Sequence, residues 1–119
     1  MKYDNLTALN LKSAEYYGYD KQSQLLVEEC SELIQAVCKY NRYKNTSKSM
    51  KCLENLVEEI TDVEIMLEQI KAMLNITEEH TRAWKAQKVM RTQERIAKEI
   101  AKKNEENGFI PCIEYLSNK

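Results

Sequence analysis

The longest regular hydrophobic pattern in the chain runs from residue 53 to residue 74, with apolar side chains at spacings of three and four. Its members are Leu53, Leu56, Ile60, Val63, Leu67, Ile70 and Leu74. This spacing predicts one face of a long amphipathic helix that packs against other helices. A second, shorter row with the same spacing predicts another such helix and comprises Leu26, Cys30, Leu33, Val37 and Tyr40.

Residues that favour helix ends divide the chain into four predicted helices. Gly18 is suited to the end of the first helix and Asp20 to the N-cap of the second. The polar stretch 45–49 predicts a turn, and Thr77, followed by two acids, predicts the start of the last helix. The predicted helices span about residues 5–17, 21–43, 50–74 and 77–106.

The composition favours an all-α fold. Two glycines and one proline in 119 residues leave few positions for the tight turns of a sheet. We therefore predict a single all-α domain over residues 1–119, of the four-helix bundle type, with a core at about 15–106 and a tail at 107–119. The two apolar rows are too extensive for one short chain to cover, so we predict a homodimer or a dimer of dimers.

Charge, length and cysteine usage exclude several classes of protein. The net charge is −1, whereas a general nucleic-acid binder is usually clearly basic. No segment approaches a membrane span in length, and the N-terminus lacks the apolar core of a signal peptide. The cysteines lack the paired spacing of a zinc site, which indicates reduced thiols in a cytoplasmic protein. They are Cys30, Cys38, Cys52 and Cys112.

Two pairs of carboxylates occupy equivalent places on the second and third predicted helices. Glu29 and Glu32 lie one turn apart, as do Glu59 and Asp62, and each pair precedes its apolar row by one residue. If the two helices pack antiparallel, the four carboxylates converge, and their repulsion raises their pKa values unless cations lie among them. Hard divalent ions suit such oxygen ligands, Mg²⁺ foremost and Mn²⁺ as a substitute.

The fourth predicted helix carries a row of cations. Lys88, Arg91 and Arg95 lie at spacings of three and four, and such a row can contact phosphate oxygens. The alternative is an ordinary solvated helix face with intrahelical pairs such as Glu94 with Lys98.

The two acid pairs resemble the motifs of a known enzyme family. Residues 28–32, followed after 26 residues by residues 59–62, resemble the E-x-x-E and E-x-x-D motifs of the MazG-like all-α nucleoside triphosphate pyrophosphohydrolases. The flanking residues 24–25 and 33–36 are similar to that family as well. The resemblance covers about residues 15–100, which is most of the chain.

The resemblance implies Mg²⁺-dependent hydrolysis of a (deoxy)nucleoside triphosphate to the monophosphate and pyrophosphate, a nucleotide-pool house-cleaning activity. It also implies a fold whose helices pair between subunits, with metal ligands at Glu29, Glu32, Glu59 and Asp62. The hypothesised general base is Glu29 or Glu32, and Glu28 is a weaker candidate.

The residues that would contact the substrate are less closely defined by the motifs. Lys88, Arg91 and Arg95 would hold the outgoing phosphates, at positions similar to family Lys and Arg residues after the second acid motif. Gln24 and Asn55 lie near the acid pairs and are candidates to hydrogen-bond a nucleotide base, or else ordinary polar residues.

Two other functions stay open. The related histidine-biosynthesis enzyme that hydrolyses phosphoribosyl-ATP shares the helical architecture and the acid pairs. A non-catalytic helical regulator or adaptor would carry the same acids as solvated groups, without stabilisation by Mg²⁺. The sequence does not determine which base or sugar is preferred, or whether the substrate is a normal or a damaged nucleotide. It also does not determine how many metal ions bind.

Overall fold

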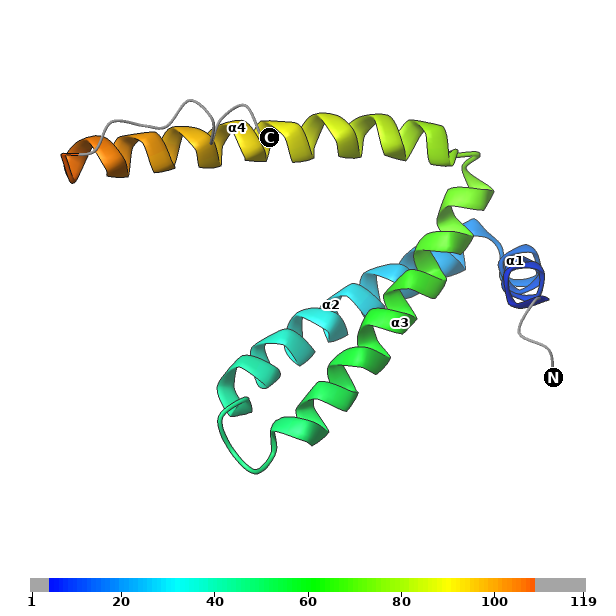
Figure 1. Ribbon diagram of the computed structural model, residues 1–119. Coiled ribbons are helices and arrows are strands. Elements are labelled where there is room, and N and C mark those ends of the chain that lie inside the picture. Colours follow the sequence, from blue (N-terminus) through cyan, green and yellow to red (C-terminus); the bar gives the residue numbers. More distant parts are fainter. Residues whose placement is uncertain (1–4, 109–119) are drawn as a thin grey trace. The chain divides into compact units, whose positions relative to one another are not determined.

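The structure, a computed structural model, describes residues 5–108 and contains four α-helices (Figure 1). They are α1 (Leu6–Tyr17), α2 (Tyr19–Tyr43), α3 (Ser49–Met73) and α4 (Glu78–Glu106). The predicted all-α class is confirmed, since these residues form no strand. The chain divides into two compact units, Met1–Ile76 with α1 to α3 and Thr77–Lys119 with α4. The bundle and the pairing of helices between subunits stay predictions.

The helix ends follow the expected residues, with one exception. Gly18 has φ 84° and donates its N–H to the carbonyl of Ala14 at 2.8 Å, which ends α1. The predicted N-cap at Asp20 is wrong, because α2 already begins at Tyr19 and Asp20 lies in its first turn. The Thr77 hydroxyl accepts a hydrogen bond from the His80 N–H at 3.2 Å and caps α4 as predicted.

α2 and α3 lie side by side and antiparallel, joined by the turn at residues 44–48 (Figure 1). Small and flexible side chains fill their interface: Ala36, Cys52 and Met66 are 1%, 3% and 4% exposed. Gln22 and Gln69 are also buried there, and Gln22 Nε2 donates to Gln69 Oε1 at 2.8 Å. Because this hydrogen bond spans the two helices, it marks their register.

The register explains where the acid pairs meet. Glu29 lies seven residues after Gln22 in α2, and Asp62 lies seven residues before Gln69 in α3. Seven residues make about two helical turns, so both acids fall on the face that carries the glutamines. The carboxylates therefore point into the α2–α3 interface, two turns closer to the connecting turn.

α1 packs on α3 at the opposite end of this helical hairpin. Asn10 Nδ2 donates to the carbonyl of Ile65 at 3.0 Å and to Glu68 Oε1 at 2.9 Å. Asn10 Oδ1 accepts from Gln69 Nε2 at 2.6 Å. A hydrogen-bond network thus joins α1, α2 and α3 through Asn10, Gln69 and Gln22.

The apolar row of α3 lies beside the α2–α3 interface. Leu53, Ile60 and Leu67 are 39%, 40% and 39% exposed, whereas Cys52 and Met66, each one residue earlier, are buried. The expectation of a packed apolar row with acids at its edge is therefore confirmed only in part, since Val63 is buried and Leu56 and Ile70 are half-buried. The row one residue earlier contains the smaller Cys52 and the amide of Gln69, which pairs with that of Gln22. This row therefore allows α3 a closer contact with α2 than the larger apolar side chains do.

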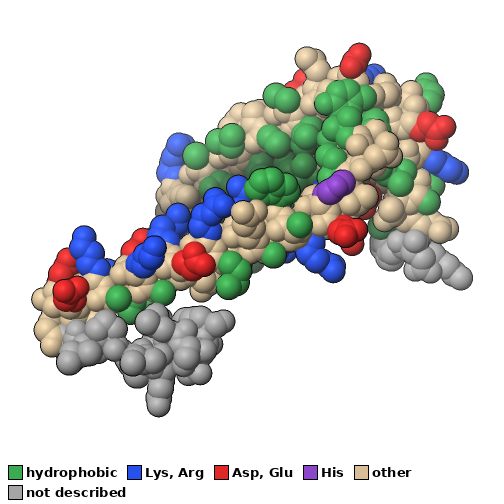
Figure 2. Space-filling view, turned by 90° about the horizontal axis from the view of Figure 1, so that it is seen from above, with side chains coloured by type: hydrophobic (Ala, Val, Ile, Leu, Met, Phe, Trp, Pro, Cys, Tyr) green, Lys and Arg blue, Asp and Glu red, His purple; other side chains and the backbone are tan. Residues whose placement is uncertain are grey.

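The corresponding side of α2 is also apolar and exposed. Val37 follows the buried Ala36 by one residue and is 41% exposed, whereas Val27 and Ile34, 68% and 65% exposed, lie further around α2 from the interface. In each helix, one row of residues faces the partner helix. The residues that come directly after this row in sequence lie on the same side of an antiparallel pair. The two helices therefore present a shared apolar face, and Figure 2 shows apolar side chains gathered on the α1–α3 unit.

Two further predictions concern thiols and membranes. Cys30, Cys38 and Cys52 are free, and Cys112 lies with the rest of the tail beyond Gly108 outside the described residues. Within residues 5–108, no helix has the apolar length that crossing a membrane requires.

Candidate metal centre

Three carboxylates from two helices converge within the α2–α3 interface. Oxygen atoms of Glu29, Glu59 and Asp62 all lie within 4.8 Å of one another, and each residue is half-buried. Glu29 comes from α2, and the other two acids lie one turn apart on α3. Oxygen atoms this close can ligate one ion, and three carboxylate donors suit a hard cation such as Mg²⁺.

Two oxygens of this cluster are buried without a partner. Glu29 Oε2 and Glu59 Oε2 are inaccessible to solvent and accept no hydrogen bond from the described part of the chain. Buried polar atoms are nearly always hydrogen-bonded, and an unpaired buried charge is costly. A cation between the helices would interact with both oxygens, so these residues fit a metal ion.

Burial and mutual repulsion raise the pKa values of two of these acids. The pKa of Glu29 rises above its ordinary 4.5 through burial first, and then through the charges of Glu32, Asp62 and Glu59. The pKa of Glu59 is raised by burial first, and then by the charges of Glu32 and Asp62. A cation bound among these carboxylates would favour their ionised forms and so oppose this rise in pKa.

Glu32 lies at the solvent-facing edge of the cluster. Its charge is the strongest charge acting on the pKa of both Glu29 and Glu59, and side-chain hydrogen bonding with Glu32 raises both pKa values further, so its carboxylate lies next to both. Its side chain is nevertheless exposed, and the three converging oxygens do not include it. Three of the four predicted ligands thus come together, and the fourth is open to solvent.

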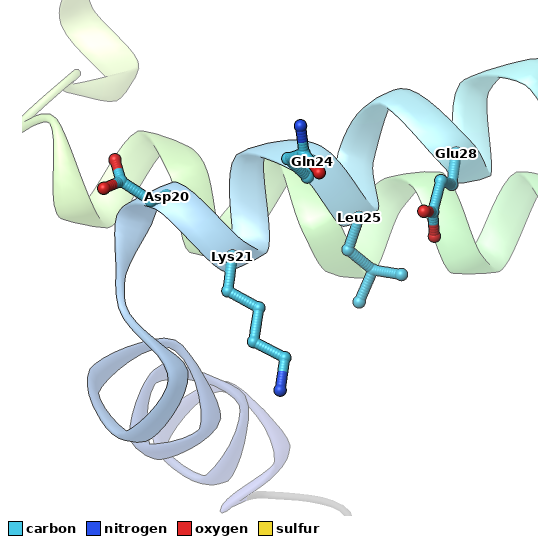
Figure 3. Close-up of a pocket in the computed structure, with 5 residues that line it drawn as sticks. All are labelled: Asp20, Lys21, Gln24, Leu25 and Glu28. Atoms are coloured by element: carbon cyan, nitrogen blue, oxygen red, sulfur yellow. The ribbon is translucent and has the colours of Figure 1, made fainter.

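Gln24 lies on α2 in a separate hollow of about 560 Å³ (Figure 3). The other lining residues are Asp20, Lys21, Leu25 and Glu28, and Figure 3 shows Lys21, Leu25 and Glu28 on the same side of the helix. None of these residues belongs to the three-acid cluster. The roles of Gln24 in base recognition and of Glu28 as a base stay predictions.

Asn55 lies between the acid cluster and the turn that connects α2 to α3. It precedes Glu59 by one helical turn and lines a hollow of about 330 Å³. The other lining residues are Lys39, Tyr43, Lys48, Lys51 and Cys52. The sequence interpretation missed the three lysines, although a signal was present: residues 33–53 contain five Lys or Arg and no acid.

The predicted phosphate-binding cations lie in the second unit. Lys88, Arg91 and Arg95 are exposed on α4, and Lys88 Nζ lies 5.7 Å from the centroid of the Trp84 ring. Figure 2 shows Lys and Arg side chains along this helix. Their role toward a substrate stays a prediction.

The chain was compared with protein-family models, curated proteins and solved structures, and none of them matches. The arguments for function are therefore the acid motifs of the sequence and the geometry of the cluster that they form.

Proposed function

We propose that the protein is a Mg²⁺-dependent nucleoside triphosphate pyrophosphohydrolase of the MazG-like type. The observation that carries this proposal is the convergence of Glu29, Glu59 and Asp62, with two buried oxygens that lack partners. The resemblance of residues 28–32 and 59–62 to the family motifs supplies the reaction class. The products would be a nucleoside monophosphate and pyrophosphate.

The roles of the acids follow from their positions. Glu29, Glu59 and Asp62 would hold Mg²⁺, which when bound neutralises charge on the triphosphate oxygens. Glu32 faces solvent beside the cluster, where it can orient the attacking water and accept its proton. As the water oxygen bonds to the α-phosphorus, the bond to the bridging oxygen breaks, and pyrophosphate departs with the electron pair.

We propose further that the protein is a homodimer or a dimer of dimers. The shared apolar face of α2 and α3, with Val37 at 41% and Ile60 at 40% exposed, supports this assembly. Large exposed apolar patches mark interaction sites on soluble proteins. Light scattering at micromolar concentration should give at least twice the mass of one chain, and a monomer mass would contradict the proposal.

The test of the reaction is pyrophosphate release from a panel of NTPs and dNTPs, with Mg²⁺ and with excess EDTA. The expected result is metal-dependent release of pyrophosphate together with the monophosphate, and the ranking would identify the preferred base. Release of orthophosphate would show that a different bond is cut. Stabilisation by Mg²⁺ without turnover of any nucleotide would contradict the substrate class and favour phosphoribosyl-ATP.

A further inference from the structure

A cationic hollow lies at the turn of the α2–α3 hairpin, outside the three-acid cluster. We call it the lysine pocket; its lining residues are Lys39, Tyr43, Lys48, Lys51, Cys52 and Asn55. Lys39 comes from α2, Lys48 from the turn and Lys51 from α3. Cys52 is 3% exposed, so the pocket is backed by the packed interface of the two helices.

The sequence around the lysine pocket is rich in cations, with Glu54 the first acid that follows, three residues after Lys51. Residues 33–53 contain five cations and no acid, in a protein whose net charge is −1. The first turn of α3 carries no acid, whereas that of α4 carries Glu78 and Glu79. Because α2 ends where α3 begins, the negative end of the α2 dipole offsets the positive end of the α3 dipole, so the lysine charges are what attracts anions to the pocket.

The aromatic ring in the pocket helps to position one of its cations. Lys48 Nζ lies 5.1 Å from the centroid of the Tyr43 ring, within the range of a cation–π interaction. This contact holds Lys48 at the pocket while leaving its ammonium N–H donors available. Lysine ammonium groups bind phosphate as compact point charges with three donors each.

The lysine pocket and the acid cluster are neighbours along the same helices. Asn55 lines the pocket, and Glu59 lies four residues further along α3, roughly 6 Å along the helix axis. On α2, Lys39 follows Glu32 by seven residues and therefore lies on the same face, about two turns away. An elongated anion of high charge density can reach both places, and this geometry suits a polyphosphate.

We infer that the lysine pocket binds the pyrophosphate group of a polyphosphate anion, either free pyrophosphate or the outer two phosphates of a nucleoside triphosphate. The second assignment rests on the proposed function, whereas binding of free pyrophosphate does not. Lys48 and Lys51 are the residues that supply the contacts nearest the start of α3. The pocket is thus a phosphate-binding site in the same compact unit as the acids.

The experiment is calorimetric titration of the full chain with inorganic pyrophosphate in EDTA. The double variant Lys48→Gln/Lys51→Gln should bind about tenfold more weakly or worse, because it loses two charge-assisted contacts. The matched control is Lys12→Gln/Lys71→Gln, which removes the same charge from exposed positions on α1 and α3. Lys39→Gln, on the other helix, should weaken binding in the same direction, and circular dichroism verifies the fold of each variant.

Each outcome of the titration either supports or contradicts the inferred pyrophosphate site. Loss in the lysine-pocket variants with retention in the control supports the site. Equal loss in both double variants, no binding by the wild type, or tighter binding of a short single-stranded oligonucleotide at the same salt overturns it.

Activity assays separate this inference from the proposed function. If pyrophosphate binds through the lysine pocket but no nucleotide is hydrolysed, the proposed function fails and the pocket stands. If the double variant Lys48→Gln/Lys51→Gln hydrolyses nucleotides with the same KM as the wild type, the lysine pocket is not a substrate site. The proposed function would then stand without it.

Discussion

The α2–α3 interface contains two polar layers that differ in whether their side chains find partners. In the amide layer, Gln69 accepts a hydrogen bond from Gln22 at 2.8 Å and donates one to Asn10 of α1 at 2.6 Å. In the acid layer, two turns away, Glu29 and Glu59 each bury an oxygen that accepts no hydrogen bond from residues 5–108. The same pair of helices thus holds one neutral, satisfied layer and one charged, unsatisfied layer.

This difference separates a structural role from a functional one. A satisfied amide network strengthens a fold and favours one register, because any shift leaves buried amides without partners. An unsatisfied acid layer destabilises the fold unless a ligand binds there. If the proposed function holds, the amide layer maintains the alignment in which the acid layer would bind a cation.

The largest expected effect concerns catalysis at the edge of the acid layer. Glu32→Gln keeps the shape of the side chain but removes the proton acceptor, so kcat for pyrophosphate release should fall by about 100-fold or more. Its melting temperature should not fall below that of the wild type, because Glu32 is exposed and its charge repels those of Glu29 and Glu59. Glu64→Gln, an exposed acid on α3, is the control; full activity in Glu32→Gln would show that the assigned role is wrong.

The next effect is stabilisation of the acid layer by metal. At a free Mg²⁺ concentration 100 times its Kd, the free energy of unfolding should rise by about 2.7 kcal/mol. Thermal unfolding in Mg²⁺ and in EDTA measures this change. Glu59→Gln should lose most of the response, and Glu64→Gln, at an exposed position on α3, should keep it. An undiminished response in Glu59→Gln would place the ion elsewhere.

A smaller effect is expected in the amide layer. Gln69→Leu leaves Gln22 and Asn10 without their partner, and the free energy of unfolding in urea should fall by about 1–3 kcal/mol. Gln35→Leu, at an exposed position on α2, should change it little. If the two variants were equally stable, the amide network would contribute nothing to the fold.

The smallest effect is the pH dependence of the metal-free protein. The pKa values of Glu29 and Glu59 are raised above 4.5 in the folded state, so the folded chain retains protons that the unfolded chain has lost. The contribution of these two acids to the free energy of unfolding is therefore greatest at acidic pH and decreases as the pH rises above 4.5. It levels off once the pH exceeds their raised folded-state pKa values. In EDTA, Glu59→Gln should flatten this decrease; curves parallel to the wild type would contradict the pKa assignment.

The helices were predictable because their signals are local. Gly18 and Thr77 mark helix ends through their own backbone and side-chain chemistry, and the structure confirms both. The shared offset of the two acid pairs was also visible, because it depends only on helical periodicity. These features need no knowledge of the neighbouring helix.

The inward-facing residues of α3 were predictable from periodicity only in part, because Val63 is buried as expected but Cys52 and Met66 are buried as well. Ile60 and Glu59 are adjacent, and hydrophobicity alone places Ile60 inward; in the single chain it is 40% exposed. The choice depends on the amide pair of Gln22 and Gln69, a contact between residues 47 apart in sequence. The lysine pocket depends likewise on the turn that brings Lys39 near Lys51.

The register of the α2–α3 hairpin also determines where the chain can change in length. A residue lost from the turn at 44–48 leaves both helices intact, so the amide and acid layers remain opposite each other. A residue lost between Gln22 and Glu29 rotates Glu29 by about 100° relative to the amide layer and turns it out of the interface. Insertions and deletions in descendants of this chain should therefore accumulate in the turn and be absent between the two layers.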